Sequence, residues 1–316
     1  MPNTRSPRHG SMQFWPRKRA KRIYPRVQSW PTSSENKPLG FYGYKVQMMH
    51  GIVEEFRPDY KKKGGKVSIP MTLIECPPLK VAAIRFYKNT EHGPIVGKDI
   101  FVSNDSLLAK KLLLPKTLPN LDKVNVDEYD DLTLVCYTQS HLTTRGQKKP
   151  EVFEIALGGK YEEKVAYAKE HKEIKISDVF GEGDQLDILG VTKGLGFQGV
   201  VKRFGVKIKA AKSEKKKRSV GNLGPWHPAH TAHTVAQGGK MGFHNRTDQN
   251  KWLLKISNED INPIGGFKRY GLVKNEYILV KGSVPGTTKR MVRLLKSKRP
   301  RKNIPKEAPQ LEVIVS

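Results

Sequence analysis

The amino-acid sequence predicts a mainly β protein with an inserted α/β domain and long basic extensions. Short runs rich in Val, Ile, Met and Phe, separated by Pro and Gly, lie on both sides of a central segment, residues 81–190. That segment holds 18 acids and 15 bases, and it contains the clearest helical patterns. The excess of the +28 net charge therefore lies outside it, in three basic runs.

The first element in the chain is an extended arm. Residues 1–38 alternate Pro, Arg, Lys and Ser without a sustained period, and the first 30 residues hold eight bases and no acid. This pattern predicts irregular structure rather than a helix.

The folded part is expected to begin near Leu39 and to consist mostly of short antiparallel strands. Two helices are predicted: 106–114, with Asn104 and Asp105 as candidate caps, and 161–172. The strands are expected at residues 44–55, 66–76, 79–87, 131–138, 151–157, 185–192, 252–256, 270–273 and 277–281.

We expect the strands on both sides of the near-neutral middle to close into one β-barrel. The predicted organisation is an arm at 1–38, a first part of the barrel at 39–90, an inserted α/β domain at 91–184, a second part of the barrel at 185–300, and a tail at 301–316. A finger extension is expected at 194–250, within the second part of the barrel.

The finger segment is Gly-rich and basic, and it shows no clear period. A structureless loop of this length in a compact domain is improbable unless it is functional or is ordered by a partner. We interpret it as an extension that folds against RNA, because aromatic residues are interleaved with its bases, as stacking on exposed nucleobases requires. The aromatic residues of the arm and finger are Phe14, Trp15, Tyr24, Phe197, Phe204, Trp226 and Phe243.

A membrane protein and a disulfide-stabilised protein are both disfavoured. No stretch approaches 18 uninterrupted apolar residues, and the first 15 residues contain no apolar segment that could serve as a signal peptide. Cys76 and Cys136 are the only cysteines, so a reducing, cytoplasmic environment is expected.

One sequence match suggests nucleotide binding, but its context argues against it. Residues 194–199 spell GxGxxG, and Glu214 follows 20 residues after the first glycine. A dinucleotide fingerprint also needs a helix that begins at the third glycine, whereas Val200, Val201 and Phe204 disfavour one. We therefore expect a turn whose backbone approaches phosphates closely.

A metal site and a catalytic site are likewise not predicted. His227, His230 and His233 recur every third residue and His244 follows, but no Cys or carboxylate lies between them and Pro228 interrupts any helix. Hydrogen bonding to RNA or stacking on it suits these histidines better. No nucleophile or acid–base pair is recognisable, so no catalytic residue, metal ligand or cofactor is expected.

The finger sequence resembles one known family. GNLGPWHP at 221–228 and TVAQGGKMGFHNRTDQNK at 234–251 resemble the central finger of the large-subunit ribosomal protein L-three family. Further matches occur in order: GSMQFWPRKRA at 10–20, VTKG at 191–194, KRFGV at 202–206, PIGGF at 263–267 and KGSVPG at 281–286. The resemblance covers nearly the whole chain and is closest to archaeal members.

The resemblance implies a translation-protein-type β-barrel whose arm and finger penetrate rRNA toward the peptidyl-transferase centre, with Trp226 and His227 at the fingertip. It implies a structural, non-catalytic protein of the cytoplasmic large ribosomal subunit that supports early assembly. The implied partners are 23S-type rRNA and neighbouring proteins of the L-fourteen and L-twenty-four-e families. Lys240 and Asp248 depart from the usual Gln and Glu, and Glu214 stands where eukaryotic relatives carry a methylated His, so that modification is not expected.

The predicted rRNA-binding residues are mostly bases of the arm, the finger and the C-terminal run. An RNA-modifying enzyme is the alternative, but it should show a cofactor loop with a helix; a chromatin-like DNA binder should show a recognition helix. The predicted set is Arg17, Lys18, Arg19, Lys21, Arg22, Lys193, Gly196, Gln198, Lys202, Arg203, Lys207, Lys215, Lys216, Arg218, Trp226, His227, His230, Lys240, His244, Arg246, Lys251, Lys289 and Arg290.

Overall fold

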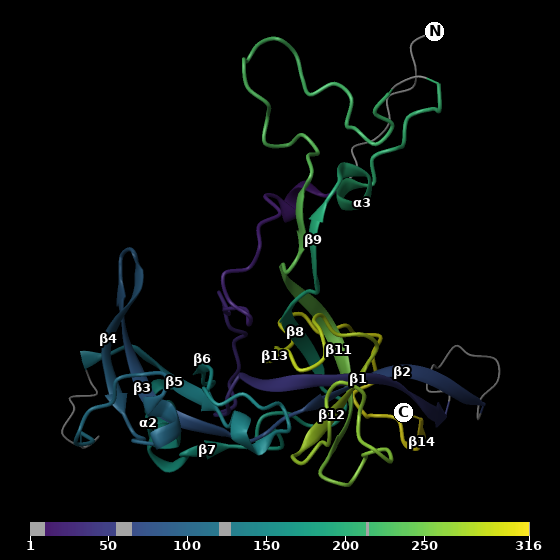
Figure 1. Ribbon diagram of the computed structural model, residues 1–316. Helices are drawn as coiled ribbons and strands as arrows, with labels where there is room; N and C mark the ends of the chain where they lie inside the picture. The colour runs from purple at the N-terminus through teal and green to yellow at the C-terminus, as the bar shows by residue number, and fades with distance from the viewer. Residues whose placement is uncertain (1–9, 55–64, 120–127, 213–214, 316) are drawn as a thin grey trace. The chain divides into compact units, whose positions relative to one another are not determined.

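The computed structural model describes residues 10–54, 65–119, 128–212 and 215–315 (Figure 1). The chain divides into two compact units, which are described separately. The smaller unit comprises residues 1–23 and 191–246, and the larger unit comprises residues 24–190 and 247–316. No helix in the described ranges combines the length and apolar character needed to cross a membrane.

A closed ring of strands forms one half of the larger unit. The strand order is β13-β8-β11-β12-β2-β1, and β1 also pairs with β13, so the ring closes. Closure leaves no unpaired edge in the ring, and it confirms the predicted barrel. The strands of the ring are β1 (Gly40–Glu54), β2 (Lys66–Glu75), β8 (Gln185–Val191), β11 (Asn245–Ser257), β12 (Tyr277–Lys281) and β13 (Met291–Lys296).

A second, antiparallel sheet forms the other half of the larger unit. Its order is β4-β3-β5-β6, with β7 paired to β3, and one continuous hydrophobic core joins it to the barrel. The rings of Tyr42 in β1 and Phe153 in β6 stack with centroids 3.5 Å apart. Its elements are β3 (Leu79–Thr90), β4 (Gly93–Phe101), α1 (Ser106–Ala109), β5 (Asp131–Thr138), the 3-10 turn Ser140–Leu142, β6 (Val152–Ala156), α2 (Tyr161–Glu170) and β7 (Glu173–Ile174).

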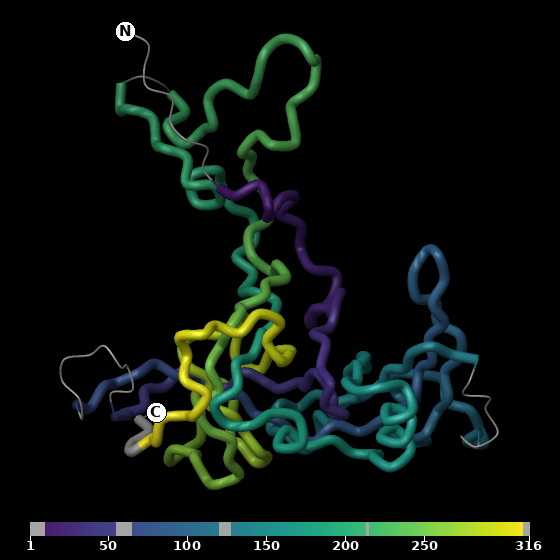
Figure 2. The backbone as a smooth tube through the Cα atoms, turned by 180° about the vertical axis from the view of Figure 1, so that it is seen from behind, coloured from purple at the N-terminus to yellow at the C-terminus, as the bar shows by residue number. Residues whose placement is uncertain are grey.

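The boundary between barrel and insertion differs from the prediction. Strand β3 was expected in the barrel as part of residues 39–90, but it pairs with β4 and β5 in the second sheet. Pro77 and Pro78 lie between β2 and β3 and cannot donate to a strand ladder, which ends the barrel strand there. The β3–β4 hairpin projects from the rest of its unit in both views (Figures 1 and 2).

Several elements were predicted with accurate bounds, and others were missed. Strands β5 and β12 have the predicted limits, whereas the helix expected at 106–114 ends at Ala109. The strand expected at 270–273 is a turn around the isolated bridge between Phe267 and Gly271. Strands β4 and β13 were not predicted, and neither was β14 (Leu311–Val315), which pairs with β1 inside the expected C-terminal tail.

Two buried charged side chains stabilise the larger unit. The Glu75 carboxylate is fully buried and accepts hydrogen bonds from the Tyr270 hydroxyl, the Lys274 amide at 3.0 Å and Asn275 Nδ2 at 2.8 Å. Arg293 of β13 is 4% exposed and donates to the Glu154 carbonyl of β6, so it links the two sheets. Burial lowers the pKa of Arg293.

The smaller unit contains few regular elements. They are the 3-10 turn η1 (Met12–Phe14), β9 (Gly194–Gln198), α3 (Val200–Phe204) and β10 (Gly239–Gly242). Strands β9 and β10 form an antiparallel two-stranded sheet.

Candidate nucleic-acid interface

The base of the finger is the β9–β10 ribbon. Phe197 pairs with Lys240 and Gln198 with Gly239, and the register shifts between Lys240 and Gly242. Gly242 has φ 78°, and a Cβ there would collide with the Lys193 carbonyl oxygen. Only glycine fits this combination of a left-handed backbone and close approach, so the turn of the chain after β10 depends on it.

A helix follows β9, which corrects the prediction from the sequence. Gly199 is the N-cap of the five-residue helix α3, and the left-handed Gly205 ends it by donating its N–H to the Val201 carbonyl at 2.9 Å. The GxGxxG segment nevertheless builds no dinucleotide unit, because β9 pairs antiparallel with β10 instead of forming a parallel βαβ unit. The acid that the fingerprint would need, Glu214, lies outside the described residues.

The N-terminal arm packs on helix α3. Trp15 lies against Phe204 with ring centroids 5.1 Å apart, and the Arg17 guanidinium lies 4.2 Å from the centroid of the same ring. Arg17 donates to the Arg203 carbonyl, and Arg203 donates back to the Arg17 carbonyl at 3.2 Å and to the Gln237 carbonyl at 2.9 Å. The arm and finger base therefore form one small packed body.

A second set of contacts fixes the arm beside His244. The Ala20 amide donates to the Phe243 carbonyl at 2.7 Å, and His244 Nδ1 lies 2.7 Å from the Lys18 carbonyl oxygen. The Gly242 amide donates to His244 Nε2 at 3.2 Å. These two contacts fix the orientation of the His244 ring between the arm and the finger base.

These contacts change the interpretation of several predicted residues. Phe204 was expected to offer a face for stacking on RNA, but it is 6% exposed and forms the centre of the arm–finger packing. Arg17, Arg203 and His244 are only partly exposed and form hydrogen bonds within the protein. Gln198 donates to the Leu195 carbonyl at 2.8 Å, and Gly196 is exposed with φ 68°. Arg17 lies in the arm, and the other residues lie in the base of the finger.

Most of the predicted bases in the smaller unit are exposed. Glu214, which lies outside the described residues, is the only acid in the sequence of this unit. The exposed members are Lys18, Arg19, Lys21, Arg22, Lys193, Lys202, Lys207, Lys215, Lys216, Arg218 and Lys240, together with Trp226, His227 and His230.

Three predicted residues belong to the larger unit. Lys251 forms an ion pair with Asp248 at 3.6 Å, and Lys289 and Arg290 lie in the loop before β13. All three are partly buried. Burial and the nearby Arg145 charge lower the pKa of Arg290.

The finger beyond its base is an open loop. Residues 206–238 contain no helix or strand in the described part of the chain, and Figure 2 shows them as a wide loop. Local hydrogen bonds occur, such as Lys209 N–H to the Lys217 carbonyl at 3.1 Å and Gly224 N–H to Asn222 Oδ1 at 3.0 Å. Trp226 is 87% exposed there. The described residues contain no cluster of three or more potential metal ligands.

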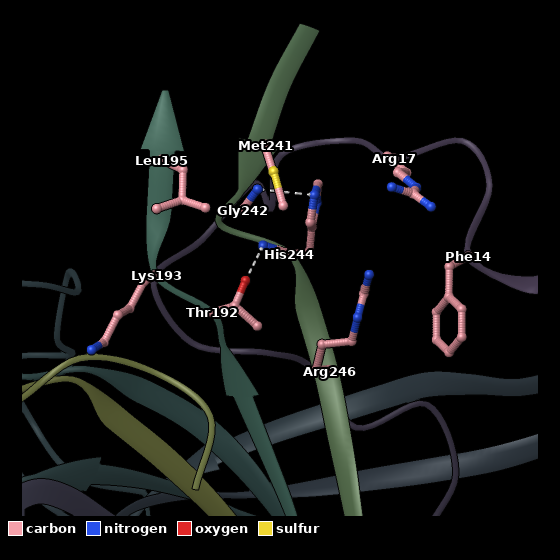
Figure 3. Close-up of a pocket in the computed structure, with 9 residues that line it drawn as sticks. All are labelled: Phe14, Arg17, Thr192, Lys193, Leu195, Met241, Gly242, His244 and Arg246. Atoms are coloured by element: carbon pink, nitrogen blue, oxygen red, sulfur yellow. Dashed lines mark hydrogen bonds between the residues drawn. The ribbon is translucent and has the colours of Figure 1, made fainter. Parts of the chain in front are cut away.

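A pocket of about 370 Å³ lies between the arm and the finger base (Figure 3). Its aliphatic members, Leu195 and Met241, could not be predicted from the sequence, because the aliphatic residues of a Gly-rich ribbon give no periodic signal. Arg246 lines the pocket, and its guanidinium carbon lies 4.7 Å from the centroid of the Phe14 ring. The lining residues are Phe14, Arg17, Thr192, Lys193, Leu195, Met241, Gly242, His244 and Arg246.

Sequence comparisons show which known proteins this chain resembles. A family model described as ribosomal protein L3 matches residues 1–111 and 117–314. A large ribosomal subunit protein uL3 of Archaeoglobus fulgidus is 46% identical over 308 residues, covering 94% of this chain and 93% of that protein. The protein of the same name from Methanobrevibacter smithii is 43% identical, covering 98% of this chain and 96% of that protein. The one from Methanocaldococcus jannaschii is 41% identical, covering 94% of this chain and 93% of that protein.

Proposed function

The chain belongs to the ribosomal protein L3 family, a structural component of the large ribosomal subunit and not an enzyme, and from that premise we propose that its arm and finger bind large-subunit rRNA. The observation that carries this proposal is the charge of the smaller unit. It holds 19 Lys and Arg residues against the single acid Glu214. Exposed bases without neighbouring carboxylates suit closely packed phosphates.

The conformation of the finger also supports binding along RNA. Its loop buries almost no apolar surface of its own, so its order depends on what surrounds it. Trp226 exposes most of its ring among Gly224, Pro225 and Pro228, which suits stacking on an unpaired nucleobase. We place Trp226 and His227 at the fingertip, directed toward the peptidyl-transferase centre.

The larger unit would act as the anchor from which the finger extends. A closed barrel with one continuous core keeps its shape without a partner, and its strands β8 and β11 lead into the finger. We propose residues 1–38 as the arm and 194–250 as the finger, a role in early subunit assembly, and neighbours of the L14 and L24e families. These assignments follow the family resemblance; the smaller unit holds residues 1–23 of the proposed arm and residues 194–246 of the proposed finger.

Salt dependence tests the rRNA proposal. Binding to a large-subunit rRNA fragment should weaken by about 10³-fold between ~50 and ~200 mM salt if roughly six phosphates are contacted. The double variant Lys215→Gln/Lys216→Gln should reduce the slope of log affinity against log salt by about 1.5. Lys148→Gln/Lys149→Gln, the same charge change on exposed residues of the larger unit, is the control. Equal slopes for both variants would contradict the proposal.

Trp226→Ala tests the fingertip assignment. The free protein should keep its melting temperature, because the side chain is 87% exposed, while subunits carrying the variant should lose translational activity. A lowered melting temperature would instead place this side chain in a stabilising contact.

A further inference from the structure

The pocket at the arm–finger base has the composition of a nucleotide site. Phe14, Leu195 and Met241 supply an aromatic and apolar wall, and Arg246, Lys193 and Arg17 supply cations. Its volume of about 370 Å³ lies at the low end of the ~300–1,000 Å³ range of small-ligand pockets. An apolar wall beside charges of one sign suits a ligand with a flat apolar body and an anionic group.

The side chains that line the pocket come from both the arm and the finger base. Figure 3 shows Met241, His244 and Arg246 on the β10–β11 segment, with Phe14 and Arg17 of the arm on one side of it and Leu195 on the other, while Lys193 points away from Phe14 and Arg17. Phe14 is 52% exposed and Leu195 is 44% exposed, so both offer apolar surface to a ligand. The Arg246 guanidinium lies 4.7 Å from the Phe14 ring centroid, which places a cation beside the aromatic wall.

The hydrogen-bonding groups of the pocket are mostly engaged within the protein. Both ring nitrogens of His244 are used, by the Lys18 carbonyl and the Gly242 amide, and Thr192 Oγ1 accepts from the His244 amide at 3.1 Å. Few groups therefore remain to read the edge of a base. The pocket can accept a base through stacking and charge with little preference for its identity.

We propose that this pocket holds one unstacked nucleotide of the bound RNA, with its base against Phe14, Leu195 and Met241 and its phosphate beside Arg246. The inference rests on the proposed function, because the nucleotide belongs to the rRNA that surrounds the arm and finger. It adds a specific site to an interface that otherwise consists of exposed Lys and Arg side chains. The arm and finger base would both contact that nucleotide, so its binding would also hold them together.

Two opposite changes of pocket volume test the site. Leu195→Trp fills the pocket and Phe14→Ala removes its aromatic wall, and neither changes charge. Chemical probing of an rRNA fragment bound to each full-length protein should show that both variants lose protection of the same unpaired nucleotide, while the other protections remain. Loss of one stacked base should weaken binding by roughly fivefold or more. Ile264→Trp, which adds the same bulk at a fully exposed position of the larger unit, should match the wild type.

The outcomes distinguish this inference from the proposed function. If the chain did not bind rRNA, the wild type and Ile264→Trp would show no protected nucleotides. If only the pocket assignment were wrong, the wild type would protect rRNA and both pocket variants would give the same pattern.

A free nucleotide is the other possible source of this ligand chemistry. An RNA nucleotide gains effective concentration from the neighbouring contacts of its chain, whereas a mononucleotide does not. The Met241 methyl signal should therefore not shift with ~1 mM adenosine or uridine monophosphate, and it should shift with the rRNA fragment. Saturation by the mononucleotides alone would overturn the assignment to RNA.

Discussion

Removing the Phe204 ring should release the N-terminal arm from the finger base. The ring is 6% exposed and is covered by Trp15 and Arg17 from the arm and by Arg203 from its own helix. Truncation of a buried Phe to Ala typically costs about 3–5 kcal/mol. Few side chains in the described part of the smaller unit are buried, so we take the lower value for Phe204→Ala. We assign this cost to undocking of the arm rather than to global unfolding.

Amide hydrogen exchange measures this local docking directly. The Ala20 amide donates to the Phe243 carbonyl at 2.7 Å, so it is protected only while the arm is docked. A cost of about 3 kcal/mol should accelerate its exchange by on the order of 100-fold, whereas the Leu294 amide of the barrel should be unaffected. Phe197→Ala, which removes a 76% exposed ring from the same unit, is the matched control.

Two results would refute this reasoning. Unchanged exchange at Ala20 would mean that Phe204 does not hold the arm. Equal acceleration at Ala20 and Leu294 would mean that the smaller unit does not open independently of the barrel.

Three further predictions concern stability. Glu75→Gln should destabilise the protein by about 1–3 kcal/mol in denaturant titration, because an amide cannot satisfy all the donors around a buried carboxylate, whereas exposed Glu259→Gln should not. Gly242→Ala should abolish the protection of the β9–β10 amides, since φ 78° and the approaching carbonyl both exclude a Cβ. Burial raises the pKa of the Cys76 and Cys136 thiols, so both should resist alkylation in the native state. The free energy of unfolding should fall as pH rises above ~8.5, because the thiols ionise in the unfolded chain but not in the folded protein. Replacing both cysteines by Ala should make this fall smaller.

The barrel could be predicted because its strands carry a local signal. Strand β12 of the barrel, like β5 of the second sheet, is almost entirely buried and rich in β-branched and aromatic residues, so composition alone marks its limits. Strand β13 was missed because it lies in a basic run, and Arg293 is buried only because Trp30, Tyr42 and Phe153 surround it. A local sequence pattern cannot predict that a charged side chain is buried when the aromatic rings around it come from distant segments.

The candidate interface was predictable in its charge but not in its packing. Basic composition identified the arm and finger as separate runs, whereas their contact joins Arg17 to Arg203 across 186 positions of sequence. The same contact explains the unpredicted helix α3. Val200 and Phe204 have modest helix propensity, but both are buried, and tertiary packing overrides that preference. Strand β4 was missed for the opposite reason, because its residues are mostly exposed and show no alternation.

The contacts that hold the arm have a consequence for the order in which the chain is synthesised. Ala20 leaves the ribosome early, but its partner Phe243 is made about 220 residues later, which takes about 10–45 s at typical elongation rates. Strand β1 likewise cannot pair with β13 and close the ring until β13 has been synthesised. Throughout that interval the nascent arm lacks the finger base on which it docks, so this contact can form only after most of the chain has been made.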